Sequence, residues 1–212
     1  MPRTVWCWWD RGIMTFKVKD FYYQKAKKEK FLARSVYKLD EIDSKFKVIR
    51  KNDSILDLGY YPGSWIQYSS NKVEQNGEIV GIDIQNISTE LKHLKNVKLF
   101  KKDIFEIKNL EDINRLEKFD VVLSDMAPST TGIKCVDQDR SFALVEKVIV
   151  ILPNFLKFKG NFVIKIFDSH EAQMLIKNEI KKKFASLNMF KPKSTRSISK
   201  EFYVIGKEYL GT

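Results

Sequence analysis

The sequence predicts an α/β fold in which helices cover both faces of a mostly parallel, seven-stranded sheet with one antiparallel strand. Two observations lead to this prediction. Short apolar runs rich in β-branched residues alternate with longer segments whose apolar residues recur at helical spacing, as in doubly wound sheets. The last two apolar runs are joined by a loop too short for a crossover helix, so one of them must run antiparallel. At 212 residues, the chain is long enough for one such domain.

The chain is strongly basic. It has 38 Lys and Arg against 27 Asp and Glu, a net charge of +11. This excess favours a polyanionic partner, nucleic acid first, over a lysine-rich surface that only aids solubility. No apolar run approaches the roughly 20 residues that span a bilayer, so we expect no membrane segment. Cys7 and Cys135 lack metal-like spacing and only two histidines are present, so we expect no metal site.

The first 30 residues precede the predicted domain, which covers residues 31–212. Residues 1–14 are left unassigned, and residues 20–30 are rich in Lys and Tyr. Asp10 and Arg11 interrupt any apolar core in the first segment, which argues against a secretory signal. We therefore expect a protein of the cytoplasm, the mitochondrion or another organelle rather than a secreted one. A helix is predicted at residues 31–46, with Lys38 at the edge of its apolar face.

A nucleotide site is predicted from the first three strands, at residues 54–58, 78–84 and 97–100. Gly59 and Gly63 separate the first strand from a helix that starts at Ser64, which permits a tight turn and close approach of a ligand. Their spacing differs from the G-x-G-x-x-G of dinucleotide enzymes. Asp83, at the end of the second strand, is placed to accept hydrogen bonds from a ribose diol, and Asp103 to meet an adenine edge. These residues leave NAD and S-adenosylmethionine as alternative ligands.

The fourth and fifth strands are predicted at residues 119–124 and 161–167. The fourth is an apolar run that breaks off at Asp125, and Pro128 cannot continue its ladder. A polar loop at residues 129–140 and a helix at residues 141–155 lead to the fifth strand, which contains Lys165. Ligands of open α/β sheets bind beyond the carboxyl ends of the strands, so both side chains are placed where chemistry would occur.

The chain ends with a helix at residues 169–182 and a predicted hairpin of strands at residues 184–190 and 201–206. The start of an antiparallel strand lies at the same edge as the ends of parallel ones. If the last strand lies beside the fifth, Asp125, Lys165 and Glu201 occupy neighbouring strands about 4.8 Å apart. Lys38 could cover the same edge, and buried charges are tolerated only when they are paired.

Six segments, in this order, resemble the FtsJ/RrmJ-type ribose 2′-O-methyltransferases. They are residues 34–39 (RSVYKL), 56–65 (LDLGYYPGSW), 81–83 (GID), 124–128 (SDMAP), 163–167 (VIKIF) and 196–201 (RSISKE). The resemblance implies a Rossmann-like methyltransferase fold, S-adenosylmethionine as methyl donor and a ribose 2′-hydroxyl of RNA as acceptor. The family usually has small residues where this chain has Tyr60 and Tyr61.

The resemblance also implies site residues. The family's Lys-Asp-Lys-Glu tetrad falls on Lys38, Asp125, Lys165 and Glu201. The predicted cofactor-binding residues are Gly59, Gly63, Trp65, Asp83, Asp103 and Asp125, with packing as the alternative role of Trp65. A 2′-hydroxyl is a poor nucleophile and needs alignment and help in losing its proton. Lys165 is the candidate for that help, either as a neutral base or as a cation that stabilises the developing alkoxide.

The leading hypothesis is an RNA ribose 2′-O-methyltransferase. The short chain is similar to members that act on a uridine of large-subunit ribosomal RNA, which predicts ribosomal RNA or the large ribosomal subunit as partner and a monomeric protein. A transfer-RNA anticodon-loop methyltransferase is the nearest alternative. A non-catalytic RNA-binding or ribosome-assembly protein on the same fold is the alternative of another class, and the glycine spacing argues against an NADP oxidoreductase. Basic clusters at residues 17–30, 181–183 and 191–200 favour RNA binding.

Overall fold

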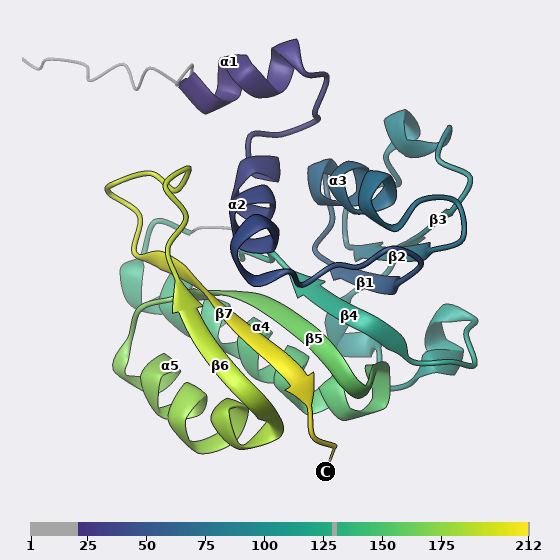
Figure 1. The fold of residues 1–212 in the computed structure, drawn as a ribbon. Coiled ribbons are helices and arrows are strands. Elements are labelled where there is room, and N and C mark those ends of the chain that lie inside the picture. Colours follow the sequence, from purple (N-terminus) through teal and green to yellow (C-terminus); the bar gives the residue numbers. More distant parts are fainter. Residues whose placement is uncertain (1–20, 129–130, 212) are drawn as a thin grey trace, which may run out of the picture.

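A seven-stranded sheet forms the centre of the computed structural model, which describes residues 21–128 and 131–211 (Figure 1). The predictions for residues 1–14 and for the lysines before residue 21 lie outside the described residues. The strand order is β3-β2-β1-β4-β5-β7-β6. The strands are β1 (Ser54–Leu58), β2 (Glu78–Asp83), β3 (Val97–Lys101), β4 (Phe119–Ser124), β5 (Leu156–Phe167), β6 (Phe184–Phe190) and β7 (Glu201–Tyr209). Strands β1 to β5 pair in parallel and β7 is antiparallel to both neighbours, so the predicted sheet is confirmed.

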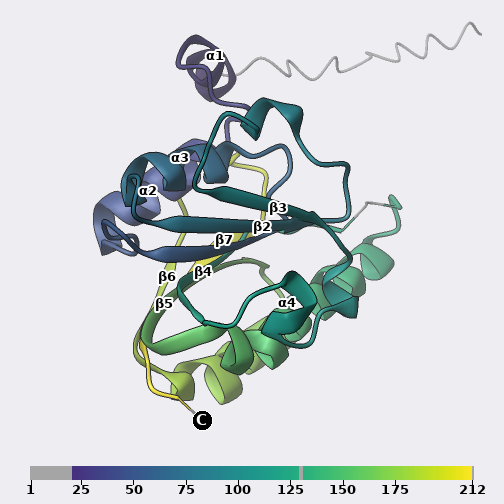
Figure 2. The ribbon, with the colours of Figure 1, turned by 90° about the vertical axis from the view of Figure 1, so that its right-hand side faces the viewer.

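Helices cover both faces of this sheet. Helices α2 (Val36–Phe46) and α3 (Ser64–Val73) pack on one face, with α1 (Phe21–Lys28) beyond α2, and α4 (Lys134–Phe155) and α5 (His170–Leu175) pack on the other (Figures 1 and 2). A separate apolar core lies on each face. Because β4 is covered on both sides, Val121, Val122 and Leu123 are all buried, as the continuous apolar run predicts. None of the helices in the described ranges is both long and apolar enough to cross a membrane.

Two predicted helix starts are wrong. The helix expected at residues 31–46 starts at Val36, because residues 29–35 form turns and the Leu32 amide donates to Oε1 of Gln67 at 2.9 Å instead of continuing a helix. Helix α4 starts at Lys134 rather than Ser141. Its first turns are polar and lack apolar spacing, but the Asp137 carboxylate accepts from the backbone amide of Thr131 at 2.7 Å.

The other two differences concern β5 and the helix before β6. Strand β5 starts at Leu156, five residues earlier than expected, and a register shift interrupts its pairing with β4 between Phe119 and Val121. The predicted helix at residues 169–182 is α-helical only to Leu175. It continues as a π turn (Ile176–Ile180) and a 3-10 turn (Lys181–Lys183).

The sheet register brings the ends of the parallel strands and the start of β7 to one edge. Ser124 of β4 pairs with Ile164 of β5, and Phe167 at the end of β5 pairs with Glu201 at the start of β7. The ends of β1 and β2 lie at the same edge because these strands run parallel to β4.

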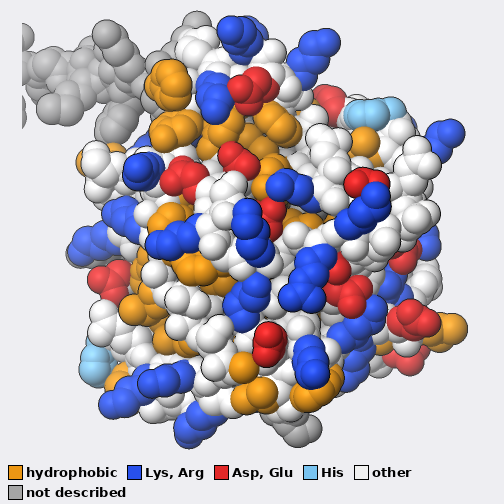
Figure 3. Space-filling view, viewed as in Figure 1, with side chains coloured by type: hydrophobic (Ala, Val, Ile, Leu, Met, Phe, Trp, Pro, Cys, Tyr) orange, Lys and Arg blue, Asp and Glu red, His pale blue; other side chains and the backbone are white. Residues whose placement is uncertain are grey.

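Basic side chains are spread over the whole face seen in Figure 3, with acidic side chains among them.

Candidate active site

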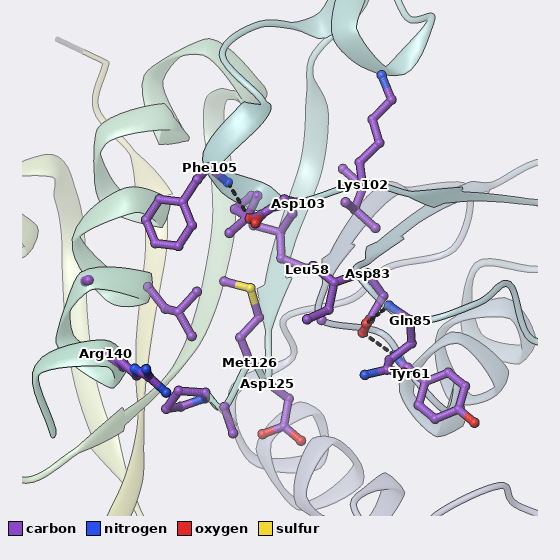
Figure 4. Close-up of a pocket in the computed structure, with 18 residues that line it drawn as sticks. Leu58, Tyr61, Asp83, Gln85, Lys102, Asp103, Phe105, Asp125, Met126 and Arg140 are labelled. Atoms are coloured by element: carbon purple, nitrogen blue, oxygen red, sulfur yellow. Dashed lines mark hydrogen bonds between the residues drawn. The ribbon is translucent and has the colours of Figure 1, made fainter. Parts of the chain in front are cut away.

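A cavity of about 650 Å³ opens at the edge of the sheet where the parallel strands end (Figure 4). The ends of β1 to β4 and the loops after them contribute Gly59, Asp83, Asp103 and Asp125 to its wall, and α4 contributes Arg140. This is the position in which open α/β sheets bind ligands. The volume falls in the range of small-molecule sites, about 300–1,000 Å³.

Asp83 is held in place by two backbone donors. The amide of Tyr61 donates to Oδ2 at 2.9 Å and the amide of Gln85 donates to Oδ1 at 2.8 Å (Figure 4). Each carboxylate oxygen retains a further lone pair, so Asp83 can still accept from a diol. Asp103 is fixed in a similar way, because its Oδ1 accepts from the Phe105 amide at 2.9 Å at the start of a 3-10 turn (Ile104–Glu106).

The loop between β1 and α3 depends on its two glycines. Gly59 and Gly63 have φ angles of +75° and +119°, in the region that side chains rarely adopt. A Cβ on Gly59 would lie 2.4 Å from Cγ of Met126, which lines the cavity beside it. A Cβ on Gly63 would lie 2.4 Å from Leu91. Of the two predicted glycines, only Gly59 lines the cavity.

Three aromatic side chains near this loop have different environments. Tyr60 is 3% exposed and packs against Gly81, away from the cavity. Tyr61 is 52% exposed and lines the cavity. Trp65 is 2% exposed, and its Nε1–H donates to the Ser35 carbonyl oxygen at 2.8 Å. Trp65 is therefore a packing residue of α3 in this structure and is not among the residues of the cavity wall.

Carboxylates gather around this cavity although the chain as a whole is basic. Asp83, Asp103 and Asp125 line it, and Asp57 of β1 is 1% exposed. Neither carboxyl oxygen of Asp57 has a hydrogen-bond partner among the described residues. Burial, and then the nearby charges of Asp125 and Asp83, raise the pKa of Asp57 well above its usual range. Lys102 and Arg140 also line the cavity, so three carboxylates and two cations give its wall a small excess of negative charge, which suits a ligand that carries positive charge better than a pyrophosphate.

Asp125, directly after β4, is paired with Lys165 of β5. The Lys165 ammonium lies 3.0 Å from Oδ1 of Asp125 and also donates to the Asp125 carbonyl oxygen at 2.6 Å. The pairing follows from the register, because Ser124 and Ile164 are partners and the next residues of two parallel strands then meet. The Lys165 side chain is buried, and a buried charge must be paired. The two Asp125 oxygens meet this requirement.

A second ion pair joins α2 to β7. The Lys38 ammonium donates directly to Oε1 of Glu201, and the two side chains are 13% and 12% exposed. Lys38 is the third residue of α2, and Glu201 is the first residue of β7. The edge of the sheet therefore carries two largely desolvated pairs of opposite charge.

Tyr203 connects these two pairs, and sequence reasoning did not single it out. Its hydroxyl donates to Oδ1 of Asp125 at 2.7 Å, and its ring centroid lies 5.8 Å from the Lys38 ammonium, within the range of a cation–π contact. Strand alternation places Tyr203 on the same face as Glu201, and the register places it opposite Lys165. The alternation could have identified it. Burial, and then the charges of Asp125 and Glu201, raise the pKa of Tyr203 well above its usual range.

The structure thus brings Lys38, Asp125, Lys165 and Glu201 together at one edge. Among the described residues, Asp125 is the member of this group that also lines the cavity. It is therefore the point at which a bound ligand and the cluster of charges meet. The catalytic roles of these four residues, and the cofactor roles of Gly59, Gly63, Trp65, Asp83 and Asp103, stay predictions.

Comparison with known proteins relates the whole of this arrangement to methyltransferases. Residues 31–209 match the family model described as "FtsJ-like methyltransferase". The chain is 44% identical over 197 residues to the ribosomal RNA large subunit methyltransferase E of Bdellovibrio bacteriovorus, covering 91% of this chain and 98% of that protein. It is 43% identical over 190 residues to the protein of the same name from Desulfatibacillum aliphaticivorans, covering 89% of each.

A solved structure is similar over the same region. A crystal structure described as a candidate ribosomal RNA methyltransferase of Plasmodium falciparum has a TM-score of 0.70 and 28% sequence identity. The similarity covers 85% of this chain and 99% of that one. The sheet and the helices that position the cavity therefore recur in a protein of related sequence.

Proposed function

This chain belongs to the FtsJ-like methyltransferase family, and we propose that it methylates a ribose 2′-hydroxyl, on a uridine of large-subunit ribosomal RNA, with S-adenosylmethionine as donor. Methyl transfer is the reaction of the family. The ribosomal substrate is supported by the names of the relatives that match along nearly their whole length. The choice of uridine rests on the resemblance alone.

One observation carries the proposal. Asp125 lines the cavity and is also bonded to Lys165 and Tyr203 of the charged cluster. A methyl transferase must hold its donor and its acceptor against each other, since alignment of the two reacting groups supplies a large share of the rate. A carboxylate shared by the cavity and the cluster is placed at the boundary between these two binding regions.

The cavity residues fit S-adenosylmethionine. Asp83 has free acceptor capacity for a ribose diol, and Asp103 lies beside it for the adenine end. Asp125, together with Asp83 and Asp103 of the cavity wall, provides the negative surroundings that a sulfonium and an ammonium group require. The bound cofactor supplies an electrophilic methyl group on sulfur.

The protein's own task is to prepare the acceptor oxygen. Lys165 lies beside two oxygens of Asp125, and we propose that it acts there as a cation. In this state, Lys165 orients the 2′-hydroxyl and stabilises the negative charge that develops on its oxygen as the hydroxyl proton leaves to solvent. Lys38 and Glu201, paired beside Tyr203, position the ribose and its phosphate.

The test is methyl transfer to defined RNAs. The purified protein is incubated with methyl-labelled S-adenosylmethionine and, in parallel, with large-subunit ribosomal RNA, small-subunit ribosomal RNA and transfer RNA. Alkali cleaves RNA through the 2′-oxygen, so a methylated ribose is found as an alkali-resistant dinucleotide. We expect label at one uridine of the large-subunit RNA.

The parallel RNAs separate the alternatives. Label in transfer RNA but not in ribosomal RNA would replace the proposed substrate by the anticodon-loop alternative. Label that is released by alkali would contradict the 2′-oxygen as acceptor. If all three RNAs remain unlabelled while the protein binds both the cofactor and RNA, the chain is an RNA-binding protein on a methyltransferase fold.

A further inference from the structure

Charge alone does not identify the surface that holds the RNA. Basic side chains are scattered over the face seen in Figure 3, and two clusters near the C-terminal end of the chain have similar charge. One is the 3-10 turn Lys181–Lys183, and the other is the loop of residues 191–200 between β6 and β7, called here the basic loop. Their positions in the fold distinguish them.

The basic loop presents its charges to solvent. Lys191, Lys193, Arg196 and Lys200 are all exposed, whereas Pro192, Ser194 and Thr195 are buried. There is no acidic residue between positions 191 and 200. The buried small residues thus anchor a loop whose exposed side chains are predominantly cationic, as phosphate contacts require.

The basic loop is fastened to α2. The Glu41 carboxylate accepts from the backbone amides of Lys193 at 2.7 Å and Ser194 at 2.9 Å. Arg34 donates to the Ser194 carbonyl oxygen from just before α2. Three side-chain-to-backbone hydrogen bonds over two successive residues fix the path of the loop, so its cations are preorganised rather than mobile.

The fixed loop leads directly into the charged cluster. Lys200 is followed by Glu201, which pairs with Lys38 on the helix that also carries Glu41. Burial, and then the positive charge of Arg196, lower the pKa of Arg34, while Glu201 acts in the opposite direction. The guanidinium groups of Arg34 and Arg196 are therefore close enough to repel each other, and two neighbouring cations of this kind suit a phosphate.

The other cluster lies at the far end of β6. Lys183 directly precedes Phe184, which pairs with Tyr209, whereas Phe190 at the end of β6 pairs with Tyr203. A strand of seven residues separates the two ends by about 20 Å. This is more than twice the Debye length of about 8 Å at physiological salt, so Lys181–Lys183 contribute little to the field at the charged cluster.

We infer that the basic loop, held by Glu41 against α2, binds the RNA backbone next to the acceptor nucleotide, and that the Lys181–Lys183 turn does not. This inference rests on the proposed function, because it takes RNA as the substrate. The chemistry recognised is the phosphodiester backbone, so the loop contributes affinity and orientation rather than choice of base.

The test compares two triple variants that remove the same charge. One is Lys193→Gln, Arg196→Gln and Lys200→Gln; the other is Lys181→Gln, Lys182→Gln and Lys183→Gln. Binding of large-subunit ribosomal RNA is measured over a series of salt concentrations. We expect the loop variant to bind about tenfold or more weakly and its salt slope to fall by about 2 to 3, since each lost phosphate contact removes about 0.7–0.9. We expect the turn variant to lose less than about threefold.

A single substitution tests the fastening. Glu41→Ala removes a negative charge and leaves every basic residue in place, so simple electrostatics predicts tighter RNA binding. The inference predicts weaker binding, because the loop loses its anchor. S-adenosylhomocysteine binding should stay at the wild-type value in all variants.

Each outcome decides the matter. Equal losses in the two triple variants, or tighter RNA binding by Glu41→Ala, would overturn the inference. Loss of S-adenosylhomocysteine binding in the loop variant would also do so, because the loop would then support the fold. If the wild-type protein binds RNA through the loop but transfers no methyl group, the proposed function fails alone. If it methylates RNA and the triple variants behave alike, the inference fails alone.

Discussion

The hydroxyl of Tyr203 donates a hydrogen bond of 2.7 Å to Oδ1 of Asp125. The Lys165 ammonium lies 3.0 Å from the same oxygen, so Tyr203 and Lys165 both contact Oδ1 of this carboxylate. Among the described residues, no hydrogen bond is made to Oδ2. Asp125 is thus oriented from the cluster side, and its second oxygen is left for a ligand in the cavity.

The Tyr203 hydroxyl should matter for turnover more than for folding. Tyr203→Phe removes one hydrogen bond to a carboxylate that Lys165 still holds, so we expect the free energy of unfolding to fall by about 1–3 kcal/mol. Methyl transfer should fall about tenfold because Asp125 is less well oriented. Because the pKa of Tyr203 is raised, the phenol stays protonated at neutral and mildly alkaline pH, and the alkaline limb of the rate profile should be the same in both proteins. Unchanged turnover in Tyr203→Phe would show that Lys165 alone orients Asp125.

Lys165→Ala should abolish methyl transfer and leave cofactor binding intact. Loss of the donor that stabilises the acceptor oxygen should lower the rate constant by about 10²–10³ or more. Calorimetric titration with S-adenosylmethionine should give an affinity near the wild-type value. Lys157→Ala is the matched control, because Lys157 is on the same strand and its ammonium lies 2.9 Å from Asp120. Preserved turnover in Lys165→Ala, or equal losses in the two variants, would remove Lys165 from the mechanism.

Asp57 should make the protein less stable as pH rises. A carboxyl group whose pKa is raised on folding keeps a proton that the unfolded chain releases, so stability declines above the ordinary pKa of about 4 and continues to decline up to the folded-state value. Asp57→Asn keeps the shape and removes the ionisation. Relative to wild type, the variant should therefore gain stability with pH, by at most about 1.4 kcal/mol per pH unit.

Urea unfolding at about pH 5 and about pH 8 measures this effect. Asp120 provides a control of opposite sign: burial alone would raise its pKa, but hydrogen bonds from Ser54 and Lys157 outweigh burial and lower it. Its stabilisation is fully present above the ordinary pKa of about 4 and is lost only as pH falls below it, so Asp120→Asn should cost the same at both of these pH values. A pH-independent difference between wild type and Asp57→Asn would show that Asp57 is ionised in the folded protein.

Substitution of Tyr61 should affect cofactor binding, whereas substitution of Tyr60 should affect the stability of the fold. Tyr61 is half exposed and lines the cavity, so Tyr61→Ala should weaken S-adenosylhomocysteine binding by roughly threefold to tenfold with little change in stability. Tyr60 is buried against Gly81, so Tyr60→Ala should cost about 3–5 kcal/mol of unfolding free energy. Calorimetry and urea unfolding measure the two effects. Wild-type affinity in Tyr61→Ala would show that its ring makes no contact with the cofactor.

Much of the fold could be predicted because its signals are local. Apolar runs bounded by polar residues predicted all seven strands, and the short loop before Glu201 predicted the antiparallel one. The starts of α2 and α4 differ from the prediction. The first turns of α4 are mostly polar, so they carry no apolar spacing, and the capping contact of Asp137 with Thr131 depends on the folded loop.

The sequence by itself determined which residues lie at the ends of strands. An apolar run that stops at a carboxylate, or that contains a lysine, can be recognised from the order of residues alone. Only the tertiary structure decided how they combine. The register of β4, β5 and β7 sets Lys165 against Asp125 and Tyr203, and the packing of α2 sets Lys38 against Glu201. It also placed Trp65 in the core and Tyr61 at the cavity. Pairings of this kind join residues up to 163 positions apart, and only the folded sheet brings them within bonding distance.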